Sequence, residues 1–184
     1  MKKLIIVSHC LLNTSSKVFY FGNKEGSKED INRKKFLKEC FDKDIQLFQL
    51  PCPEFIIYGS KRWGHSREQF EHPFFIDHSK NILKTVILQL KEYLRDDNVE
   101  ILGIVGVNGS PSCGVDFSFS ANWKGEISSN PDLNQMLKDY SYEKEYGVFI
   151  KVLKELLDTE EIKLPIIPLD ENTLDRLLGG EYED

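Results

Sequence analysis

Hydrophobic residues in this chain fall into short runs that alternate with longer segments of helical spacing. Residues 4–7 are continuously apolar and mostly β-branched, a pattern typical of a strand covered on both faces in a parallel sheet. Residues 45–50, 101–107 and 165–169 are three further strand-like runs. The pattern therefore predicts four strands.

Apolar residues at helical spacing lie between and after these runs. They predict helices over residues 28–42, with Ser27 as N-cap, over 78–95, over 146–157, and over 171–178, where Gly179 and Gly180 end the helix. Alternating strands and helices predict an α/β fold of three layers: a mostly parallel four-stranded sheet, order 2-1-3-4, with helices on both faces.

The other segments lack a sustained period. Residues 11–27 and 59–70 are expected to be loops, the second shaped by glycines and cations. Residues 116–145 are expected to form a loop or lid with a short helix near Leu133. We expect one domain over residues 1–184, because this length suits a single core.

Composition and charge exclude several classes of protein. Hydrophobic residues make up 40% and charged residues 29%, as in globular proteins, and no apolar run nears the roughly 20 residues of a membrane span. The net charge of −6 gives no basic surface for nucleic acid. The first residues lack the features of a signal peptide, so we expect a cytoplasmic protein. No pattern indicates an oligomeric state.

Three of the four cysteines follow strand-like runs. Cys10, Cys52 and Cys113 each come just after a predicted strand. The carboxyl ends of parallel strands meet at one edge of a sheet, where ligands bind. We therefore expect these thiols to converge, with Cys52 held in an extended, non-helical backbone by its flanking prolines. Cys40 lies on an apolar helix face and is expected to pack in the core.

Three neighbouring thiolates need a cation between them, because like charges resist ionisation. Zinc and an iron–sulfur cluster are the candidates. Three sulfur ligands leave one coordination position open, as in catalytic sites. His9 could complete a zinc site, but it neighbours Cys10 in an extended segment and points to the other side. We expect His9 to make a hydrogen bond beneath the loop instead.

Three motifs resemble the DUF523 family, which includes the thiouracil desulfidases (TudS). They are residues 8–13 (Ser-His-Cys-Leu-Leu-Asn), 51–54 (Pro-Cys-Pro-Glu) and 109–114 (Gly-Ser-Pro-Ser-Cys-Gly). Residues 62–64 (Arg-Trp-Gly) and 68–69 (Glu-Gln) are similar to a TudS-related subgroup of desulfidases. The resemblance covers residues 4–115 by motif.

This resemblance implies that Cys10, Cys52 and Cys113 hold a [4Fe-4S] cluster whose fourth iron takes the sulfur of a small thiolated substrate, such as a thionucleobase. The implied reaction is a hydrolytic cleavage of a carbon–sulfur bond. Glu54 is then the carboxylate nearest the cluster and the candidate base, with a helix-entry charge as the alternative role. Ser110 and Ser112 are expected to hydrogen-bond cluster or substrate, or else to shape the turn.

The chain departs from the wider family after the first cysteine. Many members carry an Arg-Tyr-Asp-Gly element there, and this chain has Asn-Thr-Ser-Ser-Lys at residues 13–17. The candidate substrate contacts are Lys17, Arg62, Trp63 and His65, with the tryptophan stacking on a flat ring.

Two alternatives to an iron–sulfur desulfidase remain from the sequence. The first is a non-catalytic zinc or iron–sulfur sensor with a closed coordination sphere. The second is a hydrolase with one cysteine as nucleophile, for which the spacing shows no His and Asn or Asp partners.

Overall fold

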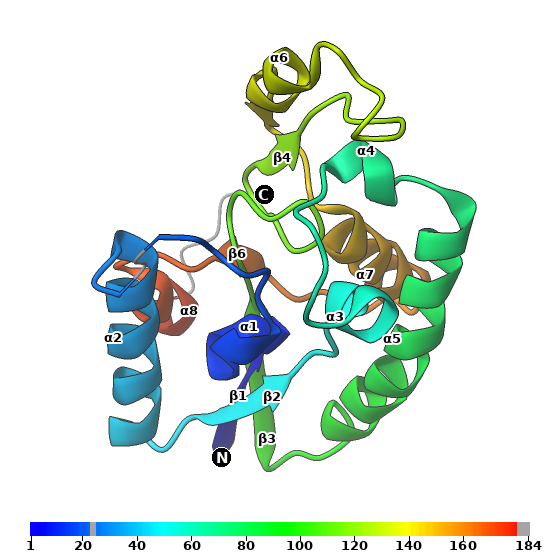
Figure 1. Ribbon diagram of the computed structural model, residues 1–184. Coiled ribbons are helices and arrows are strands. Elements are labelled where there is room, and N and C mark those ends of the chain that lie inside the picture. The colour runs from blue at the N-terminus through cyan, green and yellow to red at the C-terminus, as the bar shows by residue number, and fades with distance from the viewer. Residues whose placement is uncertain (23–24, 180–184) are drawn as a thin grey trace.

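A four-stranded parallel sheet lies at the centre of the computed structural model, which describes residues 1–22 and 25–179 (Figure 1). Its strands are β1 (Lys2–Val7), β2 (Gln46–Gln49), β3 (Val99–Gly106) and β6 (Ile166–Pro168), in the order β2-β1-β3-β6. The prediction of an α/β fold with strand order 2-1-3-4 is confirmed.

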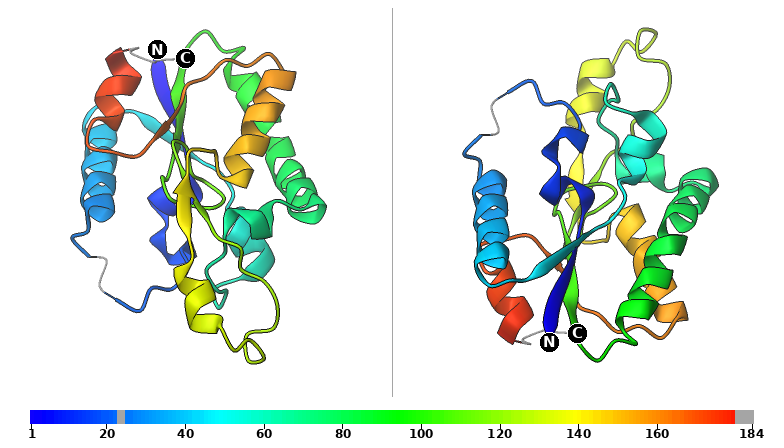
Figure 2. Two further views of the ribbon diagram at one scale, coloured as in Figure 1. Left: turned by 90° about the horizontal axis from the view of Figure 1, so that it is seen from above. Right: turned by 90° about the horizontal axis from the view of Figure 1, so that it is seen from below.

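Helices cover both faces of the sheet (Figures 1 and 2). Helices α5 (Pro73–Tyr93) and α7 (Val148–Thr159) pack on one face, and α2 (Lys28–Asp42) and α8 (Thr173–Gly179) pack on the other. Side chains along a strand point alternately to the two faces. In β1, Ile6 joins the core beneath α5 and α7, while its neighbours Ile5 and Val7 join the core beneath α2 and α8. Strand β1 thus contributes side chains to both cores.

Helix α5 starts earlier than the sequence pattern predicted, at residue 73 rather than residue 78. Pro73 occupies the first turn, where a missing N–H costs nothing, and the Nδ1 atom of His72 accepts a hydrogen bond from the backbone N–H of Phe75 at 3.3 Å. Helices α7 and α8 lie within two residues of the predicted bounds. Gly179 ends α8, and the expected stop at Gly180 lies outside the described residues.

Several short elements lie outside the helices and strands that the sequence predicted. They are α1 (His9–Leu12), a 3-10 turn η1 (Thr14–Ser16), α3 (Pro53–Tyr58) and α4 (Arg67–Phe70). None is longer than six residues, which is too short for an apolar period to be read from the sequence.

The segment 116–145 contains an antiparallel pair of strands, β4 (Ser118–Ser120) and β5 (Ser141–Glu143), and helix α6 (Leu133–Lys138). The short helix near Leu133 is confirmed, but the hairpin was not predicted, because three-residue strands show no alternation. The segment extends beyond the sheet (Figure 1). That it closes over the molecule as a lid stays a prediction.

Contacts to α4 fix this segment. The Glu68 carboxylate accepts hydrogen bonds from Ser120 Oγ (2.6 Å) and from the Ala121 N–H (3.0 Å). Arg67, which is buried, forms an ion pair of 2.9 Å with Glu145. The strand pair is therefore tied to α4 at the end of β4 and just after β5. Within the described part of the chain, no helix combines the length and apolarity that crossing a bilayer requires.

Candidate functional site

Three cysteines line one cavity of about 320 Å³ at the carboxyl edge of the sheet: Cys10, Cys52 and Cys113. Each follows the strand that the sequence pattern indicated, namely β1, β2 or β3. The thiols lie close enough for the charges of Cys10 and Cys52 to act on Cys113. Parallel strands thus bring together cysteines that are far apart in the chain. Cys40, as expected, is buried in the core beneath α2.

Short helices place the first two cysteines. Cys10 is the second residue of α1. Cys52 is the N-cap of α3, and its Sγ accepts a hydrogen bond of 3.4 Å from the Phe55 N–H. Cys52 itself is extended and non-helical, as predicted. Helix α3 begins directly after it, because Pro53 occupies the first helical position, where proline is favoured, and Glu54 lies in the first turn.

His9 makes the expected hydrogen bond, but it lies with Cys10 in helix α1 rather than in an extended segment, and it lines the same cavity instead of pointing to the other side. Its Nδ1 atom lies 3.2 Å from the carbonyl oxygen of Leu50, at the end of the neighbouring strand. Its own carbonyl accepts a hydrogen bond of 2.8 Å from Gln49 Nε2. These contacts tie the start of α1 to β2 beneath the cavity.

Cys113 lies in a tight loop after β3. The Val107 N–H donates to the carbonyl of Cys113 (2.9 Å), and the Cys113 N–H donates to Ser110 Oγ (3.0 Å). The first turn of α7 donates to the same loop: Val148 N–H to Pro111 O, and Phe149 and Ile150 N–H to Ser112 O, at 3.0–3.1 Å. The loop therefore caps α7 in place of a side chain, since Gly147 has none to offer.

Gly147 allows this close approach, because a Cβ at this position would lie 2.5 Å from the carbonyl carbon of Ser112. We expect Gly147→Ala to lower the free energy of unfolding by about 1–3 kcal/mol, as overpacking does. Urea denaturation measures the change. Gly64→Ala is the matched control, since nothing lies within 4 Å of its added Cβ. Equal stability of the two variants would contradict the close packing.

Burial sets the protonation of the thiols. It raises the pKa of Cys10 to about 11 and also raises the pKa of Cys52 and Cys113. Each thiol keeps its proton near neutral pH unless a cation replaces it. Thiolates are the preferred ligands of soft metals and iron–sulfur clusters, so three thiols facing one cavity fit such a group as donors.

A ligand role for these cysteines stays a prediction. Among residues 1–22 and 25–179, no group of three or more His, Cys, Asp or Glu side chains is arranged so that it could hold a metal ion.

Glu54 extends from α3 into the same cavity. Its Oε1 accepts a hydrogen bond of 2.5 Å from Ser112 Oγ, and its Oε2 lies 3.2 Å from Arg62 Nε. The side chains of Glu54 and Arg62 are only 13% and 3% exposed. The structure therefore links a buried carboxylate to the residue that precedes Cys113.

Ser110 and Ser112 connect this carboxylate to the cysteine loop. Their Oγ atoms lie 3.3 Å apart, and Ser112 Oγ lies 3.6 Å from Cys113 Sγ. Ser110 therefore shapes the turn and Ser112 contacts Glu54 and the Cys113 sulfur, while a hydrogen bond from either serine to a cluster or substrate stays a prediction.

Arg62 positions Glu54. Besides the ion pair, its terminal nitrogens donate to the carbonyls of Gly59 (3.1 Å) and Ser16 (2.6 Å). Each side-chain nitrogen of the guanidinium thus has a partner in the protein. Ser16 belongs to the segment that replaces the Arg-Tyr-Asp-Gly element, so this segment also supports the carboxylate.

The other predicted substrate contacts fall into two groups. Lys17 and His65 line the cavity; Lys17 forms an ion pair with Glu29, and burial lowers the pKa of His65. The His65 ring stacks on Tyr58 with centroids 4.7 Å apart. Trp63 is 75% exposed and is not among the residues that line the cavity.

Tyr142, from β5, also lines the cavity and was not found from the sequence. It lies in the segment without periodicity, far along the chain from each cysteine motif, and no residue pattern marks it.

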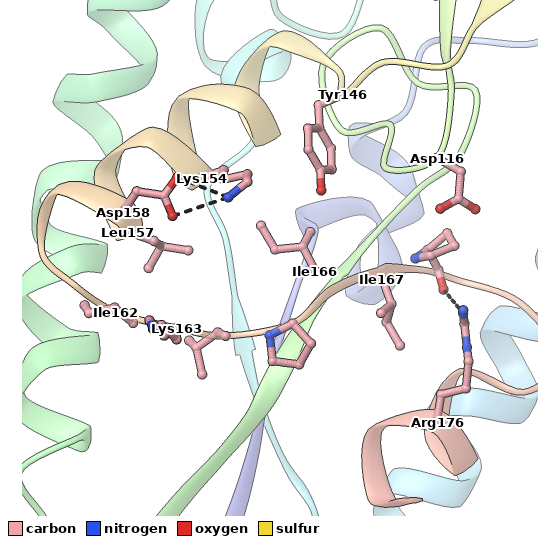
Figure 3. A pocket seen from close by; sticks show the side chains of 13 residues that line it. Asp116, Tyr146, Lys154, Leu157, Asp158, Ile162, Lys163, Ile166, Ile167 and Arg176 are labelled. Carbon is pink, nitrogen blue, oxygen red and sulfur yellow. Dashed lines mark hydrogen bonds and ion pairs between the residues drawn. The ribbon is translucent and has the colours of Figure 1, made fainter. Parts of the chain in front are cut away.

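A larger cavity of about 1230 Å³ lies beside the edge strand β6 (Figure 3). Lys154 pairs there with Asp158, and Arg176 binds the carbonyl of Pro168. The described residues that line it include no cysteine and no histidine. The thiol-lined cavity is therefore the candidate functional site.

These features define an α/β protein that presents three thiols and a buried carboxylate at the carboxyl edge of a parallel sheet. A sequence model of the family described as "Putative 2-thiouracil desulfurase" matches residues 1–169, and the chain belongs to this family. The match spans all three cysteine motifs and confirms the resemblance.

The chain is also similar to the uncharacterized protein MJ0003 of Methanocaldococcus jannaschii. The two are 28% identical over 159 residues, which cover 85% of this chain and 97% of that relative. No solved structure matches the chain significantly.

Proposed function

We propose that this protein is a desulfidase that removes sulfur from a small thiolated compound, such as a thiolated nucleobase, with the help of a [4Fe-4S] cluster. The observation that carries the proposal is the cavity itself, where Cys10, Cys52 and Cys113 meet beside the buried carboxylate of Glu54. Membership in a family described as a 2-thiouracil desulfurase supports the substrate class.

The three cysteines would hold the cluster. When bound, a cluster with three protein ligands supplies an iron with an open coordination position, which acts as a Lewis acid toward the sulfur of the substrate. The donor set fits this group, because three sulfur ligands leave that position free.

The residues of the chain manage the proton and the water. Glu54 is the base that takes a proton from the attacking water at its carboxylate oxygen, and Ser112 and Arg62 hold this carboxylate in place. Water supplies the oxygen that replaces sulfur, and the sulfur leaves as sulfide. Atoms and electrons balance without an oxidant or a reductant.

Anaerobic reconstitution with iron and sulfide tests the proposal. We expect about four irons per chain, as a [4Fe-4S] cluster requires, and release of sulfide from 2-thiouracil or 4-thiouracil. Iron binding without sulfide release would instead support the sensor alternative, and zinc binding without iron would support its zinc form. Sulfide release from protein that contains no metal would point to a cysteine nucleophile. Absence of both iron and turnover would overturn the proposal.

A further inference from the structure

An aromatic side chain of the hairpin lies over the cysteine loop. Tyr142 of β5 lines the cavity, and no other described lining residue has a phenol or phenyl ring. A Cβ on Gly109 would lie 3.3 Å from its Cε1 atom, so the ring packs directly on this glycine of the Cys113 loop. Gly109 has a φ of +79°, a conformation that favours glycine. Glycine at position 109 thus brings the ring close to the site.

Neighbouring aromatic residues hold this ring in place. Phe117, Phe119 and Tyr140 contact Tyr142 edge to face, with ring centroids 5.6 Å, 5.8 Å and 6.2 Å away. Phe119 is its cross-strand partner in the β4–β5 pair. Glu68 of α4 binds the end of β4, and β4 pairs with β5, which carries Tyr142. The ring is therefore positioned before any ligand arrives.

The Tyr142 ring still has exposed surface, because Tyr142 is 56% exposed although it contacts three other rings. The cations in the described lining are already paired, Lys17 with Glu29 and Arg62 with Glu54. His65 packs against Tyr58 and Phe70. The partly exposed ring of Tyr142 is thus the lining group that is available to stack on a flat substrate.

We propose that Tyr142 determines the specificity of the cavity by stacking on a planar heteroaromatic ring, so that the substrate class is a cyclic aromatic thioamide rather than an open-chain one. This inference rests on the proposed function. A cavity of about 320 Å³ lies within the size range of small-molecule sites and admits a single-ring ligand. Trp63, which the sequence suggested for stacking, is placed outside this lining.

Binding of uracil tests the stacking by itself, because uracil has the ring without the sulfur. We expect Tyr142→Ala to weaken the Kd of uracil, measured by titration calorimetry, by roughly tenfold, equivalent to about 1.4 kcal/mol and within the range of base–aromatic stacking. Tyr142→Phe keeps the ring and should bind within about twofold of the wild type. Glu143→Ala, at the next residue of β5 and outside the lining, is the matched control and should bind like the wild type.

Steady-state kinetics of the reconstituted protein give a second readout. Tyr142→Ala should raise the KM for 2-thiouracil by roughly tenfold and change kcat little, as expected for lost ground-state binding. Its KM for thioacetamide, which has no ring, should not change.

The outcomes separate this inference from the proposed function. Wild-type protein that binds uracil but releases no sulfide from 2-thiouracil would refute the function, while the uracil titration would still decide the role of Tyr142. Unchanged binding in Tyr142→Ala, a stronger loss in Trp63→Ala than in Tyr142→Ala, or no uracil binding by the wild type would each overturn the inference.

Discussion

Replacing Cys113 with alanine is expected to abolish both iron loading and sulfide release from 2-thiouracil. Cys113 is the most enclosed of the three thiols, and its loop is fixed on one side by Val107 and on the other by α7. No other cysteine of the chain can reach this place, since Cys40 lies in the core on the opposite face of the sheet. The loss of sulfide-releasing activity should exceed the roughly 100-fold effect of removing a residue that only hydrogen-bonds to a metal ligand.

Anaerobic reconstitution followed by iron quantification and a sulfide assay checks this prediction. Cys40→Ala is the matched control, because it removes an equally buried thiol and should cost a similar packing energy of about 1 kcal/mol. It should keep the iron and the activity of the wild type. If Cys113→Ala retains iron and turnover while its fold is intact, the three-cysteine site does not exist.

The sheet and its main helices could be predicted because their patterns are long and redundant. Buried parallel strands such as β1 are apolar on both faces, and Figure 1 shows helices on both sides of them. The order 2-1-3-4 was predicted from the alternation of strands and helices, and the rule that ligands bind where the order reverses then placed the site. The convergence of Cys10, Cys52 and Cys113 needed nothing beyond this topology.

The finer parts of the site could not be predicted, because they depend on elements of three to six residues. Helix α3 begins at Pro53 and is too short to show a helical period, and its first turn directs Glu54 toward Ser112. The pairing of Glu54 with Arg62 joins two loops and has no periodic signal. Tyr142 depends on the hairpin, whose position is set by contacts with α4 rather than by its own sequence.

Arg62 has a structural role that the sequence did not indicate, because its guanidinium binds Glu54, Gly59 and Ser16. Arg62 also lines the cavity, so its contact with substrate stays a prediction. In this network its charge orients the Glu54 carboxylate. The carboxylate that it orients is therefore the group on which the chemistry of the cavity should depend.

Glu54→Gln is accordingly expected to lower kcat for sulfide release by about 10²–10⁴-fold while the iron content stays at the wild-type level. Glutamine has nearly the same shape: its single carbonyl oxygen can accept from Arg62 while its amide N–H donates to Ser112 Oγ, but it cannot take a proton from water. Loss of the ion pair leaves the charge of Arg62 buried, which costs up to about 3–5 kcal/mol of stability. Unfolding must therefore be measured beside the kinetics, at a temperature where the variant is folded.

Two comparisons separate a base from a structural carboxylate. Glu71→Gln removes a more exposed carboxylate whose partner Arg67 keeps Glu145, and it should leave kcat and stability near wild-type values. Arg62→Met removes the charge of the other partner and leaves the Glu54 carboxylate buried, so it should destabilise the fold as strongly as Glu54→Gln. If Glu54 is the base, Arg62→Met should retain more activity than Glu54→Gln at equal stability, because the Glu54 carboxylate is still present in Arg62→Met and can accept a proton. Equal activities of these two variants would show that Glu54 only supports the loop of Cys113.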